Sequence, residues 1–508
     1  MKKLLVLTAI SFLGGCAVNP VTGDRDFMMV STEQEISIGT QNYAPMLQSQ
    51  GGAYEVDPVL TEYVQSVGNK LAAVSDVKLP YEFTVLNSSV PNAWALPGGK
   101  IAINRGLLTE INSEAELAAV LGHEIVHAAA RHTAQQISRG QLMQGLVLAT
   151  SVATNDKSYG NYAVGGASIA AQLISTKYGR SAELESDKYG MKYMKNAGYD
   201  PQGAVALQET FVRLSEGRNQ DWLSGLFASH PPSAERVQEN RKTAKKWPAG
   251  GVLGVDSYRA AMQKTLEAKP AYDAYDEGRK ALGEKKNDEA LALANKALNI
   301  FPAEANFHAL RGDVRLMNKQ YDMAVTNYNR AISRVDDFFY YPLQRGLAKK
   351  ELKQEDAAVS DLERSLELLP TAPAHYNLGL IKQGRGQTEA AIEHFRVIAK
   401  SGGDYGKAAR GQLARLELSE KPAEYVPRRC DAGSNGNLVV SVRNDAPVAI
   451  TGVKVEVTYT DSAGSAKRVS RNVGGRIEPG QIAKTDTGLG PYAGSNCPVA
   501  VTAARLAE

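Results

Sequence analysis

Four glycines recur at a nearly constant interval in the second half of this 508-residue chain. Gly278, Gly312, Gly346 and Gly379 lie 34, 34 and 33 residues apart, and an alanine follows each of them twelve residues later. A fixed period of this length, with small residues at fixed positions, predicts pairs of helices that touch where the side chains are small. Such pairs bury their apolar faces by stacking on one another, so an α-solenoid is expected here. The alanines are Ala290, Ala324, Ala358 and Ala391.

These positions resemble the tetratricopeptide repeat, a helix pair that recurs every 34 residues or so. The resemblance implies a solenoid over residues 269–420 whose concave face docks peptides or other proteins, with a rigid spacer as the alternative. Proline follows two of the repeat glycines after 24 residues, at Pro302 and Pro370. The second repeat has Asp336 at that position and so departs from the pattern.

The composition is that of a globular protein with several domains. The chain is 43% hydrophobic and 22% charged, and its formal net charge is +3. Because a chain of 508 residues is too long for one core, two to four domains are expected. It has no run of lysine or arginine that could neutralise several phosphates, so nucleic acid is not expected as a partner.

Residues 1–15 have the pattern of an export signal. Two lysines precede an apolar run from Leu4 to Leu13, which is too short to span a bilayer. The residues that end at Cys16 resemble the bacterial lipobox, which implies cleavage before Cys16 and attachment of lipid to it. Residues 16–30 are then expected to be a lipid-anchored tether in the periplasm. By resemblance to lipoprotein sorting, the lack of aspartate after the cysteine favours the outer membrane.

Residues 429–508 have the pattern of a small β domain. Apolar and polar residues alternate in several stretches, for example residues 437–442, which predicts a small antiparallel sheet or sandwich. Cys430 precedes the first of these expected strands and Cys497 precedes the last. In an oxidising compartment this even pair predicts one disulfide, and two reduced core thiols are the alternative.

Residues 31–268 alternate helical and short extended patterns. A Pro-Gly-Gly turn followed by alternating isoleucines predicts a strand within residues 92–106. Ser113 and Glu116 form a capping-box pair that predicts the start of a helix. Residues 142–174 are mostly small and apolar around a polar stretch. They are expected to form either a helical plug near the candidate site described below or an ordinary buried helix pair.

The helix after this cap carries the sequence H-E-x-x-H. His123 and His127 lie four residues apart, so they share one helix face and can direct their imidazole nitrogens at one metal ion. Glu124 projects about 100° around the helix from His123, where it can take a proton from water without ligating the metal. This spacing is typical of zinc hydrolases, and a partly exposed helix with solvated histidines is the alternative.

A catalytic zinc with an open fourth position needs a third protein ligand, and Glu183 is the candidate. Residues 181–190 favour a helix that places Glu183 and Asp187 on one face, so Asp187 can accept a hydrogen bond from a ligating histidine and fix its tautomer. His132 lies nine residues after the first histidine, which predicts a place on the opposite side of the helix and a structural or solvated role. Glu185 is expected to point away from the site.

Three motifs, in this order, resemble a zinc metallopeptidase family that includes the HtpX-type membrane proteases and the CAAX prenyl endopeptidases. They are H-E-I-V-H, then R-S-A-E-L-E-S-D at residues 180–187, then S-H-P-P-S-A-E-R at residues 229–236. With the repeats, they favour the exported, BepA-like branch, and the resemblance covers residues 19–240. It implies a mainly α, zincin-type domain with a small sheet and Glu124 as general base. The zinc ligands that it implies are His123, His127 and Glu183.

The same resemblance implies roles for further residues. His230 matches a family histidine that either ligates zinc in a resting state or steadies the oxyanion, and Arg236 is expected to anchor its loop through a carboxylate. Ser186 stands where the family has alanine, a change that is expected to be harmless. A strand is expected to pair with an extended substrate backbone. Its residues are Gly98, Gly99, Lys100, Ile101, Ala102 and Ile103.

Together these patterns predict a lipid-tethered zinc endopeptidase of the bacterial cell envelope. The resemblance implies that it degrades misfolded or misassembled envelope proteins, with the repeats docking substrates or the outer-membrane assembly machinery. The alternative is a periplasmic chaperone or assembly scaffold with a structural or latent zinc site. The glutamate beside the metal favours the enzyme, because a structural site needs no base.

Overall fold

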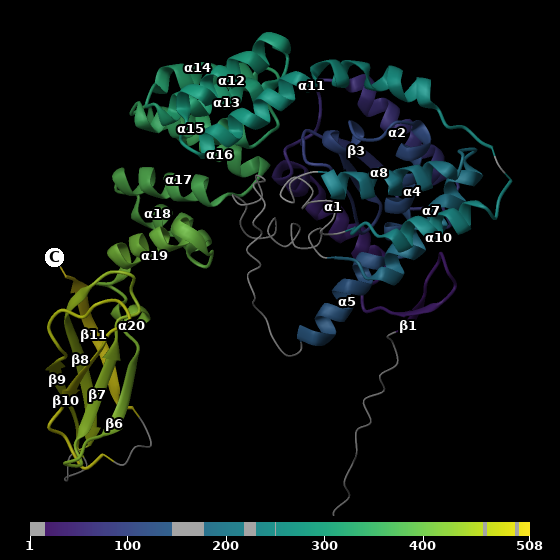
Figure 1. The fold of residues 1–508 in the computed structure, drawn as a ribbon. Coiled ribbons are helices and arrows are strands. Elements are labelled where there is room, and N and C mark those ends of the chain that lie inside the picture. The colour runs from purple at the N-terminus through teal and green to yellow at the C-terminus, as the bar shows by residue number, and fades with distance from the viewer. Residues whose placement is uncertain are drawn as a thin grey trace, which may run out of the picture. The chain divides into compact units, whose positions relative to one another are not determined.

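The computed structural model describes residues 16–144, 177–217, 230–248, 250–460, 465–492 and 497–507. The chain divides into two compact units, Met1–Pro370 and Thr371–Glu508 (Figure 1). The expected signal peptide and nearly all of the expected plug at residues 142–174 lie outside the described residues. In the part of the chain that is described, no helix has both the length and the apolar character needed to cross a membrane.

A three-stranded sheet forms part of the main core of the first unit. Its strands are β3 (Glu82–Leu86), β4 (Ala93–Leu96) and β5 (Lys100–Asn104), in the order β3-β5-β4. β5 pairs in parallel with β3 and antiparallel with β4, so both of its edges are occupied. The prediction that substrate pairs with residues 98–103 is therefore wrong, because β5 has no free edge to offer another strand. β4 has a strand neighbour on one side only among the described residues.

Helices cover both faces of this sheet (Figure 1). α2 (Pro58–Ala73) and α4 (Glu114–Ala129) pack on the face that carries Ala93 and Ile101. α1 (Thr32–Ser49) packs on the opposite face, where its apolar residues meet those of β4. The alternation of side chains along β4 and β5 thus divides the core between two helix layers.

α4 is buried along its whole length. Ser113 caps its N-terminus by accepting a hydrogen bond from the Glu116 N–H at 3.1 Å, as the capping pair predicts. The helix ends at Ala129, and Arg131 adopts a left-handed conformation with a φ of 63°. A non-glycine residue in that conformation breaks the helix, so α5 (His132–Gln144) starts in a new direction.

α7 (Arg180–Asn196) crosses α4 at two glycines. A Cβ atom on Gly122 would lie 3.1 Å from the carbonyl oxygen of Gly190, and one on Gly190 would lie 3.0 Å from the nitrogen of His123. The two backbones therefore touch, and this places the acidic side chains of α7 beside the histidines of α4. α8 (Gln202–Gly217) also packs on α4, and α10 (Ala234–Ala244) packs on α7 and α8.

Ser186 on α7 is fully buried, and its hydroxyl has no hydrogen-bond partner among the residues described. A buried polar group without a partner costs about 1–3 kcal/mol of folding stability, so serine at this position is destabilising and not harmless. We expect Ser186→Ala to raise the free energy of unfolding of the first unit by about 1 kcal/mol. Urea unfolding measures this change, and a variant less stable than the wild type would contradict it.

The tether expected at residues 16–30 is instead a folded hairpin that packs on the rest of the first unit. β1 (Cys16–Val18) and β2 (Arg25–Phe27) pair antiparallel. Met28 and Val30, which follow the hairpin, are buried against α5. Burial of these apolar side chains stabilises the packed arrangement over a free polar linker.

Six helices of the repeat array belong to the first unit. A Cβ atom on Gly312 would lie 2.7 Å from the Tyr328 ring, so the glycine lets the first helix of a pair approach a large residue on the second. Ala324 is fully buried at the same contact. The predicted helix pairs are thus confirmed. The helices are α11 (Val255–Gly283), α12 (Asn287–Ile300), α13 (Ala305–Met317), α14 (Tyr321–Ile332), α15 (Tyr340–Glu351) and α16 (Glu355–Leu368).

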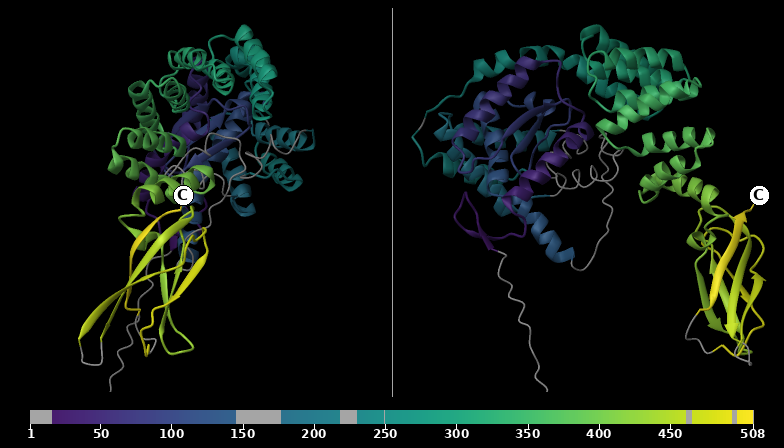
Figure 2. Two further views of the ribbon diagram at one scale, coloured as in Figure 1. Left: turned by 90° about the vertical axis from the view of Figure 1, so that its left-hand side faces the viewer. Right: turned by 180° about the vertical axis from the view of Figure 1, so that it is seen from behind.

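α11 runs without a break through the domain boundary expected between residues 268 and 269 (Figure 2). Tyr258 and Met262 on its first half pack in the core that contains the sheet. Ala281 and Leu282 on its second half pack in the first repeat. One helix therefore serves two cores, and the boundary prediction is corrected because no linker separates them.

The second repeat departs from the proline pattern in a loop that docks on α1. In this docking loop, residues 333–339, the carbonyl of Asp337 accepts a hydrogen bond from Gln48 Nε2 at 2.5 Å. The ring of Phe338 lies over Gly52, where a Cβ atom would come within 2.9 Å of it. The docked backbone explains why this repeat lacks the proline, since the loop follows the surface of α1 and not the usual turn between repeats.

The second unit contains the last repeat helices and a β-sandwich. The repeat glycine Gly379 again faces a large residue, Phe395. A short helix, α20 (Pro422–Tyr425), leads to the sandwich. The repeat helices are α17 (Ala372–Gly384), α18 (Thr388–Ala399) and α19 (Gly403–Glu417).

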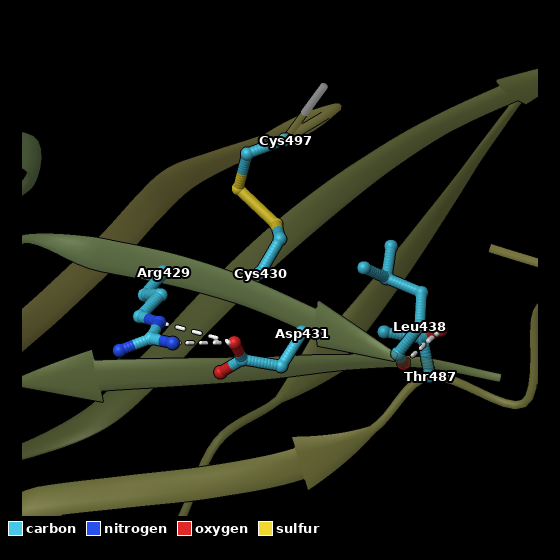
Figure 3. Close-up of a disulfide and its surroundings, with 6 residues drawn as sticks. All are labelled: Arg429, Cys430, Asp431, Leu438, Thr487 and Cys497. Carbon is cyan, nitrogen blue, oxygen red and sulfur yellow. Dashed lines mark hydrogen bonds and ion pairs between the residues drawn. A yellow bond between two sulfur atoms is a disulfide. The ribbon is translucent and has the colours of Figure 1, made fainter. Parts of the chain in front are cut away.

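Two three-stranded antiparallel sheets form the sandwich, in the orders β10-β7-β6 and β11-β8-β9. Buried valines of β7, β8 and β11 fill the space between the sheets. A disulfide joins Cys430 to Cys497 (Figure 3). Cys430 lies inside β6 and not before the first strand, because pairing with β7 extends the sheet further than the alternation suggests. The strands are β6 (Arg428–Ala432), β7 (Leu438–Arg443), β8 (Ile450–Thr460), β9 (Ala466–Asn472), β10 (Ile482–Asp486) and β11 (Val499–Leu506).

Candidate metal centre

Four side chains from three parts of the first unit converge on one point. α4 contributes His123 and His127, α7 contributes Glu183, and the segment before α10 contributes His230. One potential ligand atom from each residue lies within 4.8 Å of all the others. All four side chains are buried. Within the described residues this is the one group of its kind.

The distances within this group fit a tetrahedral metal site. His123 Nε2 lies 3.0 Å from His127 Nε2 and 3.3 Å from His230 Nδ1. The Glu183 carboxylate lies 3.4 Å from His127 Nε2 and 3.0 Å from His230 Nδ1. Ligands bonded to zinc at 2.0–2.1 Å in a tetrahedron are about 3.3 Å apart. The residues therefore fit a four-coordinate ion, with His230 in the fourth position.

The protonation states of the group also suit a cation. Burial lowers the pKa of His127 well below its usual value, so its imidazole stays neutral. Burial alone would raise the pKa of Glu183, but the charge of His230 and hydrogen bonds from His127 and His230 hold it well below its usual value. A neutral His127 and an ionised Glu183 are the forms that bind a metal ion. Burial would lower the pKa of His230, but the charges of Glu183 and Glu124 raise it, so a metal ion would take the place of the His230 proton.

Glu124 lies beside this group but is not part of it. Its Oε1 is 3.6 Å from His230 Nε2, and its Oε2 is buried without a hydrogen-bond partner among the described residues. Burial raises the pKa of Glu124 above the usual value for glutamate. An acceptor of this kind next to a metal position has the geometry and basicity to take a proton from water.

Asp187 and Arg236 form a charged support behind the group. Asp187 Oδ1 lies 2.9 Å from His123 Nδ1. The Arg236 guanidinium donates to both Asp187 oxygens at 2.7 Å and lies 2.9 Å from Glu183 Oε2. Burial would raise the pKa of Asp187, but Arg236 outweighs burial and holds it below the usual value. Arg236 thus holds both Asp187, which orients His123, and Glu183, which lies beside the histidines.

His132 and Glu185 lie closer to the group than the sequence suggests. Because α4 ends before His132, this residue turns back and places its Nδ1 2.9 Å from His127 Nδ1. Glu185 Oε1 lies 3.5 Å from His132 Nε2, so it faces the site and does not point away. The ring of Tyr178 stacks on His127, with centroids 3.9 Å apart. No sequence signal marks the helix end, since alanines precede it and no glycine or proline follows.

A mainly apolar pocket adjoins His123 and Glu124. Ala93 of the edge strand β4 lies on its wall, together with His123 and His230. Gln208 also lines the pocket, and its Oε1 is buried without a hydrogen-bond partner in the described part of the chain. The apolar lining includes Val120, Met191, Met194, Leu207 and Phe211.

Residues 58–244 match peptidase family M48, and they include every residue of the centre. Metalloprotease YcaL of Escherichia coli strain K12 is 31% identical over 185 residues, which cover 36% of this chain and 67% of that protein. The chain belongs to peptidase family M48. Membership of this metalloprotease family implies a bound metal ion, and the buried group described above could hold it.

Other relatives match different shares of this M48 chain. A Vibrio cholerae relative is 32% identical over 230 residues, which cover 43% of this chain and 46% of that protein, or about half of its length. The beta-barrel assembly-enhancing protease of Yersinia pestis is 26% identical over 393 residues, covering 71% of this chain and 79% of that protein. Among solved structures, a thermophilic TPR protein of Thermus thermophilus covers 29% of the M48 chain and 81% of its own, at 19% identity and a TM-score of 0.26.

Proposed function

We propose that this M48 chain is a zinc-dependent endopeptidase in which His123, His127 and Glu183 bind one zinc ion. The observation that carries the proposal is the convergence of these three side chains, with the unpaired carboxylate oxygen of Glu124 next to them. Two imidazoles and one carboxylate are a common ligand set for catalytic zinc. A structural zinc site in a scaffold protein has no use for a buried base, so Glu124 favours the enzyme over the scaffold.

Each residue of the site has its own proposed role in peptide hydrolysis. A bound zinc ion would supply a Lewis acid that polarises a peptide carbonyl and makes water more acidic. Glu124 takes the proton of the attacking water and passes it to the leaving amine. Asp187 and Arg236 hold His123 and Glu183 in place. His230 either fills the fourth position in a resting state or turns to steady the oxyanion during the reaction.

We further propose that β4, and not β5, receives the substrate. An extended peptide added to the free edge of β4 would run beside His123, because Ala93 lies on the wall of the pocket next to that histidine. The apolar lining of this pocket favours an apolar side chain next to the scissile bond. The unpaired Gln208 oxygen can accept a hydrogen bond from a substrate or from water.

The cellular role follows from the N-terminal pattern and the repeats. Lipid on Cys16 would keep the protein in the envelope, at the periplasmic face of the outer membrane. The name of the Yersinia relative refers to the assembly of β-barrels. Misfolded or misassembled envelope proteins are the proposed substrates, and the repeats are proposed to dock them or the assembly machinery.

The test is cleavage of an unfolded protein by the purified chain. β-Casein is incubated with the metal-free chain, with the chain reloaded with zinc, and with the reloaded chain plus a chelator. We expect fragments in the reloaded sample alone, at internal positions in the casein sequence. Cleavage that survives the chelator would contradict the metal mechanism, and binding of casein without cleavage would favour the scaffold.

A further inference from the structure

A row of polar side chains leads from His127 to the N-terminal hairpin, with a hydrogen bond at each end and a longer ion-pair contact between His132 and Glu185. His127 Nδ1 faces His132 Nδ1 at 2.9 Å, and His132 Nε2 faces Glu185 Oε1 at 3.5 Å. Asn19, in the turn of the hairpin, donates from Nδ2 to the same Glu185 oxygen at 3.0 Å. The row thus joins three segments that are far apart in sequence. We propose that His132, Glu185 and Asn19 are positioning residues for the metal ligand His127, so that the hairpin is part of the metal centre.

If His127 binds a metal, the contacts of the row assign the protons of both imidazoles. His127 must present the lone pair of Nε2 to a metal, so its proton is on Nδ1 and is donated to His132 Nδ1. His132 then accepts at Nδ1 and carries its own proton on Nε2, which faces Glu185. The Glu185 carboxylate carries negative charge and no proton, so it favours the His132 tautomer with its proton on Nε2, and through His132 the tautomer of His127. The Asn19 amide donates a hydrogen bond to that carboxylate.

The row is held rigidly at its hairpin end. Asn19 is buried, and its side-chain Oδ1 accepts from the Val21 N–H at 2.9 Å within the turn. Its Nδ2 also donates to Asp26 at 3.1 Å, and Asp26 accepts from Gln135 of α5 at 2.9 Å. Asn19 is therefore fixed to both the hairpin and α5, and it cannot turn away from Glu185 without breaking several bonds.

The two metal-binding histidines differ in how they are supported. His123 is oriented in one step by Asp187, which is itself paired with Arg236. His127 is oriented in two steps, through His132 to Glu185. Groups that orient a metal ligand usually contribute about 10- to 100-fold to metal affinity. We therefore expect the support of His127 by His132 and Glu185 to contribute as much to zinc affinity as the support of His123 by Asp187. No recognised sequence motif marks the support of His127.

Zinc affinity, measured on the full chain by competition with a chromogenic chelator, tests the proposal. His132→Leu should weaken zinc binding by about 10- to 100-fold. His132→Asn places an amide oxygen near the position of Nδ1, so it should bind zinc within about threefold of the wild type. Asn19→Ala, at the far end of the row, should weaken binding by about three- to tenfold. Gln136→Ala, on the same helix as His132 but outside the row, is the matched control and should bind as the wild type does.

The melting temperature of each metal-free variant separates positioning from stability. A residue with a merely structural role would lower that temperature and leave zinc affinity unchanged, and that result for His132→Leu would overturn the proposal. Equal affinities for His132→Leu and His132→Asn would overturn it too. If His132→Leu does not fold, Glu185→Leu tests the proposal in its place, and the same loss of zinc affinity is expected. The inference rests on the proposed metal site, but the two fail differently: a wild type that binds no zinc contradicts the site itself.

Discussion

Glu124→Gln should lower the rate of peptide hydrolysis by about 10²- to 10⁴-fold, because the amide cannot take a proton from water. Zinc content should not change, since Glu124 lies beside the converging ligand atoms and is not one of them. The measurement is kcat/KM on a quenched fluorescent peptide, together with the zinc content of the purified variant. Substrate binding should persist, so the variant should retain β-casein without cutting it.

A control variant separates this effect from the loss of any buried charge. Glu116 lies on the same buried helix, and its carboxylate accepts hydrogen bonds at the helix start. Glu116→Gln should therefore affect stability more than the rate of hydrolysis. If Glu124→Gln cleaves within tenfold of the wild-type rate, Glu124 is not the base and the proposed mechanism is wrong.

Arg236→Met should destabilise the metal-free first unit by about 3–5 kcal/mol, the usual cost of removing one partner from a buried ion pair. Arg236 is buried against Asp187 and Glu183, so the substitution leaves two buried carboxylates without their cation. Urea unfolding followed by tryptophan fluorescence measures the change in this unit, because all three tryptophans of the chain precede residue 371. Added zinc should restore part of the loss, since it supplies positive charge next to Glu183.

The matched control for this prediction is Arg241→Met on the same helix. Arg241 pairs with Glu209 at 2.6 Å, but both side chains are about half exposed. An exposed pair contributes about 0–1 kcal/mol, so this variant should unfold close to the wild-type midpoint. If the two arginine variants lose the same stability, Arg236 does not hold the carboxylates and its role as an anchor is wrong.

The part of the centre that could be predicted depends on spacing along single helices. His123 and His127 follow from a four-residue interval, and the same interval relates Glu183 to Asp187. The packing of α4 on α7 could not be predicted from spacing alone, because no pattern within either helix indicates that the two cross. The resemblance to a known family supplied that pairing, and the glycines at the crossing give its physical reason.

The parts that could not be predicted depend on contacts between distant segments. β5 is a central strand because β3, from an earlier part of the chain, pairs with it, and no local pattern in residues 98–103 reveals this. His132 reaches His127 because the helix ends at Ala129, where the sequence has no breaker. Residues 16–30 pack through a few scattered apolar side chains, among them Val21, Met28 and Val30, which are too few to show as a pattern.

The unbroken course of α11 and the docking loop decide how this chain can be divided for experiments. A fragment cut at residue 268 would lose the second half of a helix, including Ala271 and Tyr272, and would uncover the part of the sheet core on which they pack. It would also leave Gly52 without the Phe338 ring above it. Expression of such a fragment should yield aggregates. A chain that stops near Pro370 keeps the whole first compact unit, and with it all the residues of the metal centre.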